Sequence, residues 1–130
     1  MLKKILLAAS LLFSSVAFSQ TKAVLIEMNE DKGVERHSYY FGPVKINMPS
    51  YINYRVTNTG TTPLAFQRAT IGGIGFSARH SCTGVLNPQA RCQFTIQYAP
   101  FFEGYHVGQF RLAFDQGYEI VVDVSGQAVR

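Results

Sequence analysis

Apolar and polar residues alternate with a period of two along much of the chain. The alternation is clearest in four runs, residues 51–58, 91–98, 108–114 and 118–124. In one of them, Phe94, Ile96 and Tyr98 share a face, and the opposite face carries polar side chains. Such alternation is typical of half-buried strands in antiparallel sheets, because successive side chains point to opposite faces. These runs therefore predict four strands that each cover part of a core.

Shorter apolar segments and turn residues extend this pattern. Weaker strands are predicted at residues 23–28, 38–41 and 64–70, and residues 29–36 form a charged connection. Turn signals rich in Asn, Asp, Gly and Pro separate the runs. No stretch has the helical periodicity that the crossover helix of a parallel sheet would need. About seven or eight short strands with frequent turns predict an all-β fold, an immunoglobulin-like antiparallel β-sandwich.

Residues 1–19 differ in character from the rest of the chain. Two lysines give a positive start, a short apolar stretch follows, and Ala17 and Ser19 are placed for cleavage. This order is typical of a secretory signal peptide, and the apolar stretch is shorter than the roughly 20 residues of a membrane span. A buried N-terminal helix is the alternative. We predict a signal peptide at 1–19 and therefore an exported protein, periplasmic or extracellular.

Removal of the signal peptide leaves residues 20–130, a length typical of a single domain. We expect no transmembrane segment in this part, because no apolar run approaches the required length. The formal net charge of +4 includes Lys3 and Lys4, so processing lowers it to +2 (4 − 2). The remaining charges are scattered along the chain. This small and dispersed charge excludes the clustered basic surface of a nucleic-acid-binding protein.

The sequence contains two cysteines, Cys82 and Cys92. In a cytosolic protein this pair could be part of a metal site, but export favours a disulfide. Closing a loop of about ten residues would stabilise the fold by a little under ~3 kcal/mol in the chain-entropy model. We therefore predict a structural disulfide without a redox role.

Several motifs follow one another along the chain. They are Phe41-Gly42-Pro43-Val44, Asn58-Thr59-Gly60-Thr61-Thr62-Pro63-Leu64, Gly75-Phe76-Ser77, Leu86-Asn87-Pro88 between the two cysteines, Tyr98-Ala99-Pro100, and Val124-Ser125-Gly126-Gln127-Ala128. Their order resembles the abnormal-spindle/Hydin (ASH) family of immunoglobulin-like domains, related to major sperm protein and including the bacterial choice-of-anchor D type. The resemblance covers nearly all of residues 20–130. It implies a protein-interaction or scaffold role and no catalytic residues.

One segment departs from the family pattern. The turn after Pro100 is usually small or polar in relatives, whereas here it contains Phe101, Phe102, Tyr105 and His106. Aromatic anchors carry much of the energy of protein interfaces, so these residues are candidates for contact with a partner. The alternative is that one or two of the rings fold back and cap the end of the sandwich.

The sequence gives little support for a metal site, a catalytic site or a phosphate-binding loop. His37, His80 and His106 lie in different predicted elements without metal-ligand spacing, so we interpret them as ordinary surface histidines and expect no metal site. Nothing resembles a nucleophile elbow, so no catalytic residue is assigned. The glycine-rich segment 71–75 lacks the Lys-Ser/Thr of a phosphate-binding loop and better fits a bulge or a loosely held edge strand. We expect no cofactor.

Two classes of function remain open. The favoured hypothesis is a non-catalytic protein-binding or structural module of the bacterial envelope, with another envelope or secreted protein as its partner. Such a module would act through its sheet edges, the aromatic loop or the glycine-rich segment. The alternative is a small secreted carbohydrate-binding or metal-binding factor or enzyme. A small-molecule ligand is not indicated by any motif.

Overall fold

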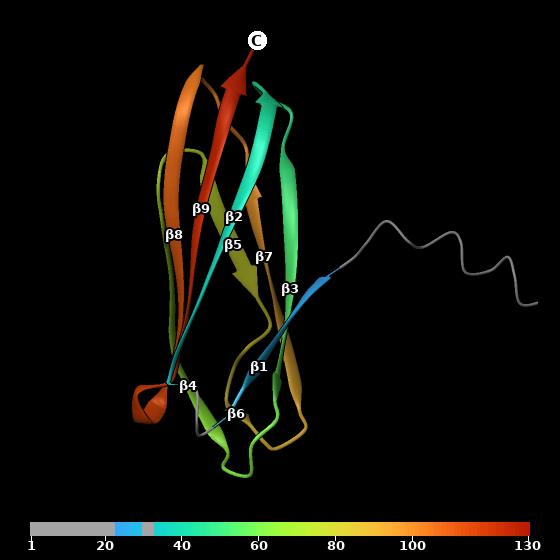
Figure 1. Ribbon diagram of the computed structural model, residues 1–130, viewed down its shortest axis with the longest axis vertical. Helices are drawn as coiled ribbons and strands as arrows, with labels where there is room; N and C mark the ends of the chain where they lie inside the picture. The colour runs from blue at the N-terminus through green and yellow to red at the C-terminus, as the bar shows by residue number, and fades with distance from the viewer. Residues whose placement is uncertain (1–22, 30–32) are drawn as a thin grey trace, which may run out of the picture.

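The computed structural model describes residues 23–29 and 33–130, so the predicted signal peptide lies outside the described residues. The described chain is almost entirely β-structure (Figure 1). Its elements are β1 (Ala23–Met28), β2 (Val34–Lys45), β3 (Ser50–Asn58), β4 (Leu64–Gly72), β5 (Phe76–His80), β6 (Val85–Leu86), β7 (Arg91–Tyr98), β8 (Gly104–Phe114), the short 3-10 helix η2 (Asp115–Gly117) and β9 (Glu119–Val129).

The strands form two sheets that pack face to face. One sheet has the order β1-β3-β7-β5, and the other has the order β2-β9-β8-β4-β6. The long strands β2, β9 and β8 lie side by side in one layer, with β3 and β7 in the layer behind them (Figure 1). The prediction of an immunoglobulin-like β-sandwich is therefore confirmed.

The pairing is antiparallel except at one side of the sandwich. β1 pairs in parallel with β3, and β2 pairs in parallel with β9. β1 and β2 belong to different sheets and run in opposite directions (Figure 1). The interpretation of residues 29–36 as a connection is wrong at its end, since β2 already begins at Val34.

The core lies between the two sheets and is rich in aromatic rings. Tyr54, Phe94 and Phe110 stack in sequence, with ring centroids 4.8 and 4.5 Å apart, and bridge the two layers. All three are buried, as the alternating pattern requires. Burial, and to a smaller degree the neighbouring Tyr39, raises the pKa of Tyr54 to about 12. The phenol is therefore neutral at physiological pH.

Glycine permits close contact between backbone and ring at one end of the core. A Cβ atom on Gly126 would lie 2.3 Å from a ring carbon of Tyr98. Tyr98 is fully buried and stacks on Phe76 at a centroid distance of 4.6 Å. The small residue on β9 thus makes room for the large ring on β7.

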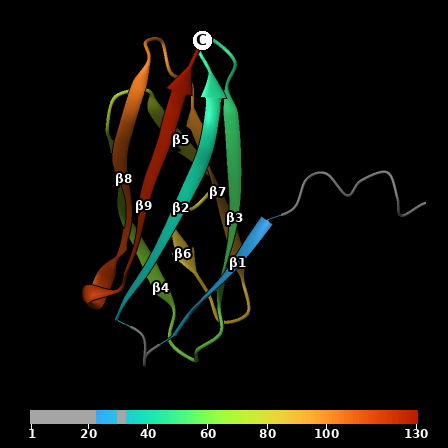
Figure 2. The same cartoon turned by 45° about the horizontal axis from the view of Figure 1, so that its top comes forward.

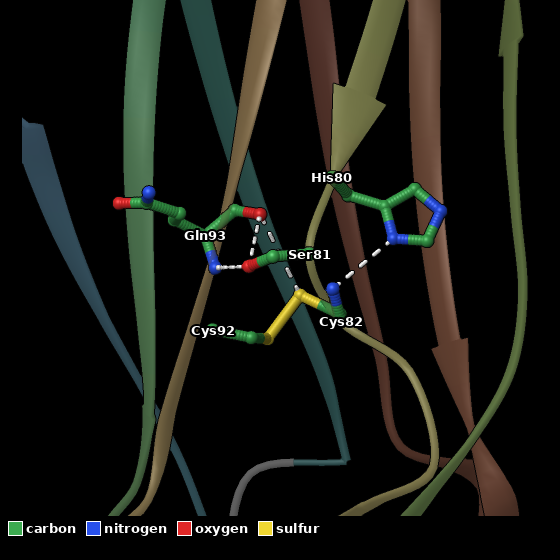
Figure 3. The surroundings of a disulfide bond; sticks show 5 residues. All are labelled: His80, Ser81, Cys82, Cys92 and Gln93. Carbon is green, nitrogen blue, oxygen red and sulfur yellow. Dashed lines mark hydrogen bonds between the residues drawn. A yellow bond between two sulfur atoms is a disulfide. The ribbon is translucent and has the colours of Figure 1, made fainter.

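The predicted disulfide is confirmed, and it lies at the opposite end of the sandwich. Cys82, in the connection after β5, is bonded to Cys92 on β7, with their Cα atoms 5.0 Å apart. Beside it, the Ser81 backbone N–H donates to the carbonyl of Gln93. The Ser81 hydroxyl accepts from the Gln93 N–H (Figure 3). The backbone N–H of Cys82 donates to the Nδ1 atom of His80. These bonds fix the connection against the middle of the sheet.

A buried asparagine organises the same end. Asn58 is fully buried, and its side-chain amide donates to the carbonyls of Thr62 and Leu86, both at 2.9 Å. Its side-chain oxygen accepts from the backbone N–H of Gly60 at 3.0 Å. One side chain therefore satisfies three backbone groups and joins the turn after β3 to β6.

Candidate protein-binding surface

Three loops meet at the end of the sandwich that also carries the C-terminus (Figure 2). They are residues 46–49, 73–75 and 99–103. The Asn47 N–H donates to the carbonyl of Pro100 at 2.9 Å, and the Ala99 N–H donates to the carbonyl of Gly75 at 2.8 Å. The central loop is thus bonded to both of its neighbours. Backbone groups make these bonds, and side chains on all three loops are exposed.

Large apolar side chains are exposed on all three loops. Met48 is 59 %, Ile74 54 %, Phe101 63 % and Phe102 44 % exposed. We call these four residues the apolar tip. Apolar residues exposed singly are ordinary, but four on loops that are bonded together are typical of an interaction surface.

The two phenylalanines of the tip are held in a fixed arrangement. Their rings meet edge to face at a centroid distance of 5.2 Å. Phe102 also meets the imidazole of His106 edge to face, at 4.8 Å. Phe102 therefore folds back partly onto the sandwich, while Phe101 projects into solvent. Both rings are exposed, so the prediction that they contact a partner stays a prediction.

His106 is buried, so its interpretation as a surface histidine and contact residue is wrong. It is 7 % exposed because it occupies an inward-facing position of β8. Its Nδ1 atom is hydrogen-bonded to the hydroxyl of Tyr98 at 2.7 Å, and its Nε2 atom is buried without a partner among the described residues. Burial, followed by the neighbouring Tyr40, raises the pKa of Tyr98. The hydrogen-bonded Tyr98–His106 pair contacts Phe102 from the core side and supports the tip from inside.

Tyr105 is 62 % exposed but does not belong to the tip. It lies on β8, paired with Gln127 of β9, and alternates with the inward-facing His106. Its ring is therefore placed on the outer face of the sheet, whereas Phe101 and Phe102 lie on the loop at its end. The predicted aromatic cluster is thus divided among the tip, the core and a sheet face.

The charges near the tip are few and largely balanced. Glu103 accepts from Arg130 at 2.9 Å, in an exposed ion pair beside the aromatic loop. Lys45, at the end of β2, is exposed as well. An exposed pair of this kind adds little stability, but it removes most of the net charge from the rim.

Sequence reasoning named segment 71–75 as a possible contact surface but did not single out Ile74, and it missed Met48. Met48 follows a buried strand residue by four positions, and Ile74 lies between Gly73 and Gly75. A large apolar residue between two glycines is a usable signal, because both glycines have positive φ angles and place the residue at a turn. Met48 carried no comparable signal, since its loop meets the other two only through tertiary contacts.

The other histidines are separated in the fold. His37 is on β2, with its Nε2 atom 3.5 Å from Glu35, and His80 at the end of β5 packs against the ring of Phe66. In residues 23–29 and 33–130, no three His, Cys, Asp or Glu side chains gather as they would around a metal ion. No helix in the same residues is long and apolar enough to cross a membrane.

Comparison with solved structures identifies similar sandwiches. The ASH/PapD-like domain 7 of human CEP192 matches with a TM-score of 0.55 and 14% identity, over 74% of this chain and 83% of that domain. The secreted serine protease VesC of Vibrio cholerae matches with a TM-score of 0.56 and 18% identity. The VesB protease of the same organism matches with a TM-score of 0.60 and 13% identity.

The extent of these matches limits what they show. The match covers 68% of this chain but 21% of VesC, and 70% of this chain but 30% of VesB. No profile of a known protein family matches the sequence. No curated protein matches it either. At these identities the comparisons show the fold alone, an immunoglobulin-like sandwich shared with an ASH/PapD-like domain.

Proposed function

We propose that this chain is an exported, non-catalytic protein-binding module of the bacterial envelope, and that the apolar tip is its binding surface. The observation that carries the proposal is the exposure of Met48, Ile74, Phe101 and Phe102 on three loops fixed to one another by backbone hydrogen bonds. A preorganised surface of this kind lowers the entropy lost on binding, and aromatic side chains are favoured anchors.

A protein partner accounts for the tip better than a lipid surface. Peripheral membrane binding combines apolar insertion with attraction between basic side chains and anionic lipids. At the tip, Arg130 is already paired with Glu103, which leaves Lys45 as the nearby cation without a carboxylate in ion-pair distance among the described residues. A rigid, nearly neutral apolar surface suits the apolar centre of a protein interface.

The comparisons and the disulfide support the remaining parts of the proposal. Disulfides such as Cys82–Cys92 form and persist in oxidising compartments, which favours export. One of the similar structures is a secreted protease, of which the sandwich matches about a fifth, so the fold there accompanies a larger protein. The order of motifs supports the finer assignment to the bacterial choice-of-anchor D type.

The proposal is tested by affinity capture with the full chain exported by its native leader. The wild-type protein and the variant Phe101→Ser/Phe102→Ser would be incubated with envelope extracts, and bound proteins would be identified by mass spectrometry. The matched control is Val85→Ser, because Val85 is 54 % exposed and lies on β6, away from the tip. Circular dichroism would first establish that each variant is folded.

We expect a partner that is retained by the wild type and by Val85→Ser and lost with the tip variant. Retention of the same partner by the tip variant would show that binding uses another surface. Flotation with anionic vesicles, run in parallel, separates the lipid alternative: vesicle binding that requires Phe101 and Phe102 would replace the protein partner by a membrane.

A further inference from the structure

The outer face of the five-stranded sheet contains an open groove with a volume of about 670 Å³. It runs across β2, β9 and β8 and reaches the end of β4 and Gly73, and none of the four side chains of the apolar tip lines it. Its lining includes the rings of Tyr40 and Tyr105 and the polar residues Ser38, Asp123, Gln109 and Ser125. The volume lies within the range of small-ligand sites, roughly 300–1,000 Å³.

Strand register determines the layout of the groove. Ser38 pairs with Asp123, which pairs with Gln109, which pairs with Gly72, so these positions form one row across four strands. The next row along the strands contains Tyr40, Ser125 and Val107. Tyr105 lies one row further, on a strand about 10 Å from that of Tyr40 at ordinary strand spacing. Both exposed rings therefore lie on the same side of the polar row, and Ser125 lies on the strand between their strands.

Glycine is the reason that the sheet face is hollow here. Gly72 ends the polar row without a side chain, and a Cβ atom added there would meet open space. Next to it, a Cβ atom on Gly73 would lie 2.5 Å from the carbonyl oxygen of Val107, so β4 and β8 approach more closely than side chains allow. The floor of the groove is therefore backbone, and the tyrosine rings rise above it.

The polar groups of the groove are held in place by a network. The Gln109 side-chain amide donates to Asp123 at 2.8 Å, and Arg36 lies 3.6 Å from the other oxygen of that carboxylate. Arg111 donates to the side-chain oxygen of Gln109 at 2.9 Å and to Glu119 at 3.1 Å. Each arginine has a carboxylate partner, so the network as a whole carries no net charge.

We propose that this groove binds a neutral saccharide. A sugar ring has an apolar C–H face that packs on an aromatic ring, and its hydroxyl groups both donate and accept hydrogen bonds. Tyr40 and Tyr105 supply the rings, and Asp123, Gln109 and the two serine hydroxyls supply acceptors and donors in a fixed arrangement. The tyrosines are 57 % and 62 % exposed, as stacking platforms for a ligand must be.

The charge balance decides between ligand classes. An anionic ligand such as a phosphate ester would need unpaired cations, but Arg36 and Arg111 already face Asp123 and Glu119. A purely apolar ligand would bury the carboxylate and the amide without giving them new partners, which is costly. A neutral polyhydroxylated ligand needs no unpaired cation, and its hydroxyl groups give the carboxylate and the amide new hydrogen-bond partners. This inference does not depend on the proposed function of the apolar tip.

The inference is tested by NMR titration of the ¹⁵N-labelled protein. Maltotetraose, cellotetraose, mannotetraose and the tetramer of N-acetylglucosamine would each be added up to about 10 mM, since an open groove binds weakly. We expect at least one of them to shift the backbone amides of Ser38, Gln109 and Ser125. Tyr40→Ala and Tyr105→Ala should each weaken that binding ~10-fold, whereas Tyr40→Phe and Tyr105→Phe, which keep the rings, should retain it.

The matched control is Tyr51→Ala, because Tyr51 is 53 % exposed on the outer face of the other sheet. It should leave the titration unchanged, and the amide spectrum of every variant would show whether the fold is intact. The proposal is overturned if none of the four sugars shifts these amides, or if the shifts persist in both alanine variants. Shifts produced equally by inorganic phosphate would assign the groove to anions instead. Failure of the capture experiment at the apolar tip would not change any of these outcomes of the NMR titration.

Discussion

The two ends of the sandwich are both built from loops that are tied together, but they are tied in different ways. At the disulfide end, side chains make the connections: Asn58 bonds three backbone groups, and Cys82 is joined to Cys92. At the apolar tip, backbone groups connect the loops, and the Tyr98–His106 pair supports them from inside. The loops of the first end are mainly polar, whereas those of the second expose Phe101 and its apolar neighbours.

This difference assigns stability to the disulfide end and binding to the apolar tip. At the disulfide end, Asn58, Cys82 and Cys92 are buried and bonded within the chain. A structural role therefore accounts for them. At the tip, by contrast, large apolar side chains remain exposed to solvent, where they bury little surface within the chain. If this distinction is correct, substitutions at the disulfide end should mainly change stability, and substitutions at the tip should mainly change binding.

The largest effect is expected for Asn58→Ala. The substitution removes three hydrogen bonds and leaves the carbonyls of Thr62 and Leu86 and the N–H of Gly60 without their partner. We expect the free energy of unfolding to fall by ~4 kcal/mol, because unsatisfied buried groups cost about 1–3 kcal/mol each. Urea denaturation would measure the change.

Asn53→Ala is the matched control for this substitution. Asn53 lies on the same strand but is only half-buried, and it accepts a single bond from the hydroxyl of Thr95. It should cost ~1 kcal/mol or less. Equal losses for the two substitutions would show that Asn58 has no special role at this end.

The second-largest loss of stability is expected when the disulfide is removed. Cys82→Ala/Cys92→Ala should lower the free energy of unfolding by a little under ~3 kcal/mol, because the unfolded chain regains the freedom of a ten-residue loop. Reduction of the wild-type protein should cause a similar loss, and the double variant should not respond to reductant. Free thiols in the native exported protein, detected by alkylation and intact mass, would contradict the prediction.

Much of the fold could be predicted from the sequence. The alternation in residues 91–98 has the same bounds as β7, and the weaker segment 23–28 coincides with β1. The short strands β5 and β6 were missed, because Phe76–His80 and Val85–Leu86 are too short to show periodicity above their surroundings. The parallel pairs β1–β3 and β2–β9 were missed as well. Alternation indicates which face of a strand is buried, but it does not indicate which strand lies beside it.

The candidate sites were harder to predict. Alternation through β8 could have placed His106 inside, opposite the exposed Tyr105, but the glycine at position 104 obscured where the strand begins. The apolar tip joins residues from three loops, and the groove joins residues from four strands. Both depend on tertiary proximity, which a single sequence does not contain. Hydrophobic pattern therefore predicted the core well and the surfaces poorly.

A smaller effect is expected from Tyr98→Phe, which tests the support beneath the tip. The ring and its stacking on Phe76 are kept, but the Nδ1 atom of His106 loses its partner. We expect a loss of ~1–2 kcal/mol and faster amide hydrogen exchange in the loop 99–103. Tyr105→Phe is the control, because its hydroxyl is exposed and its removal should change stability by less than ~0.5 kcal/mol.

The smallest effect on stability is expected at the tip itself. Phe101→Ser should change the free energy of unfolding by no more than ~0.5 kcal/mol, because the side chain is 63 % exposed and has little burial to lose. Phe102→Ser should cost somewhat more, since its ring contacts His106. A loss above ~2 kcal/mol for Phe101→Ser would mean that the ring serves the fold, and the contrast between the two ends would then fail. A near-zero change would show that the fold does not need this ring, which is the outcome that a residue kept for contact with a partner requires.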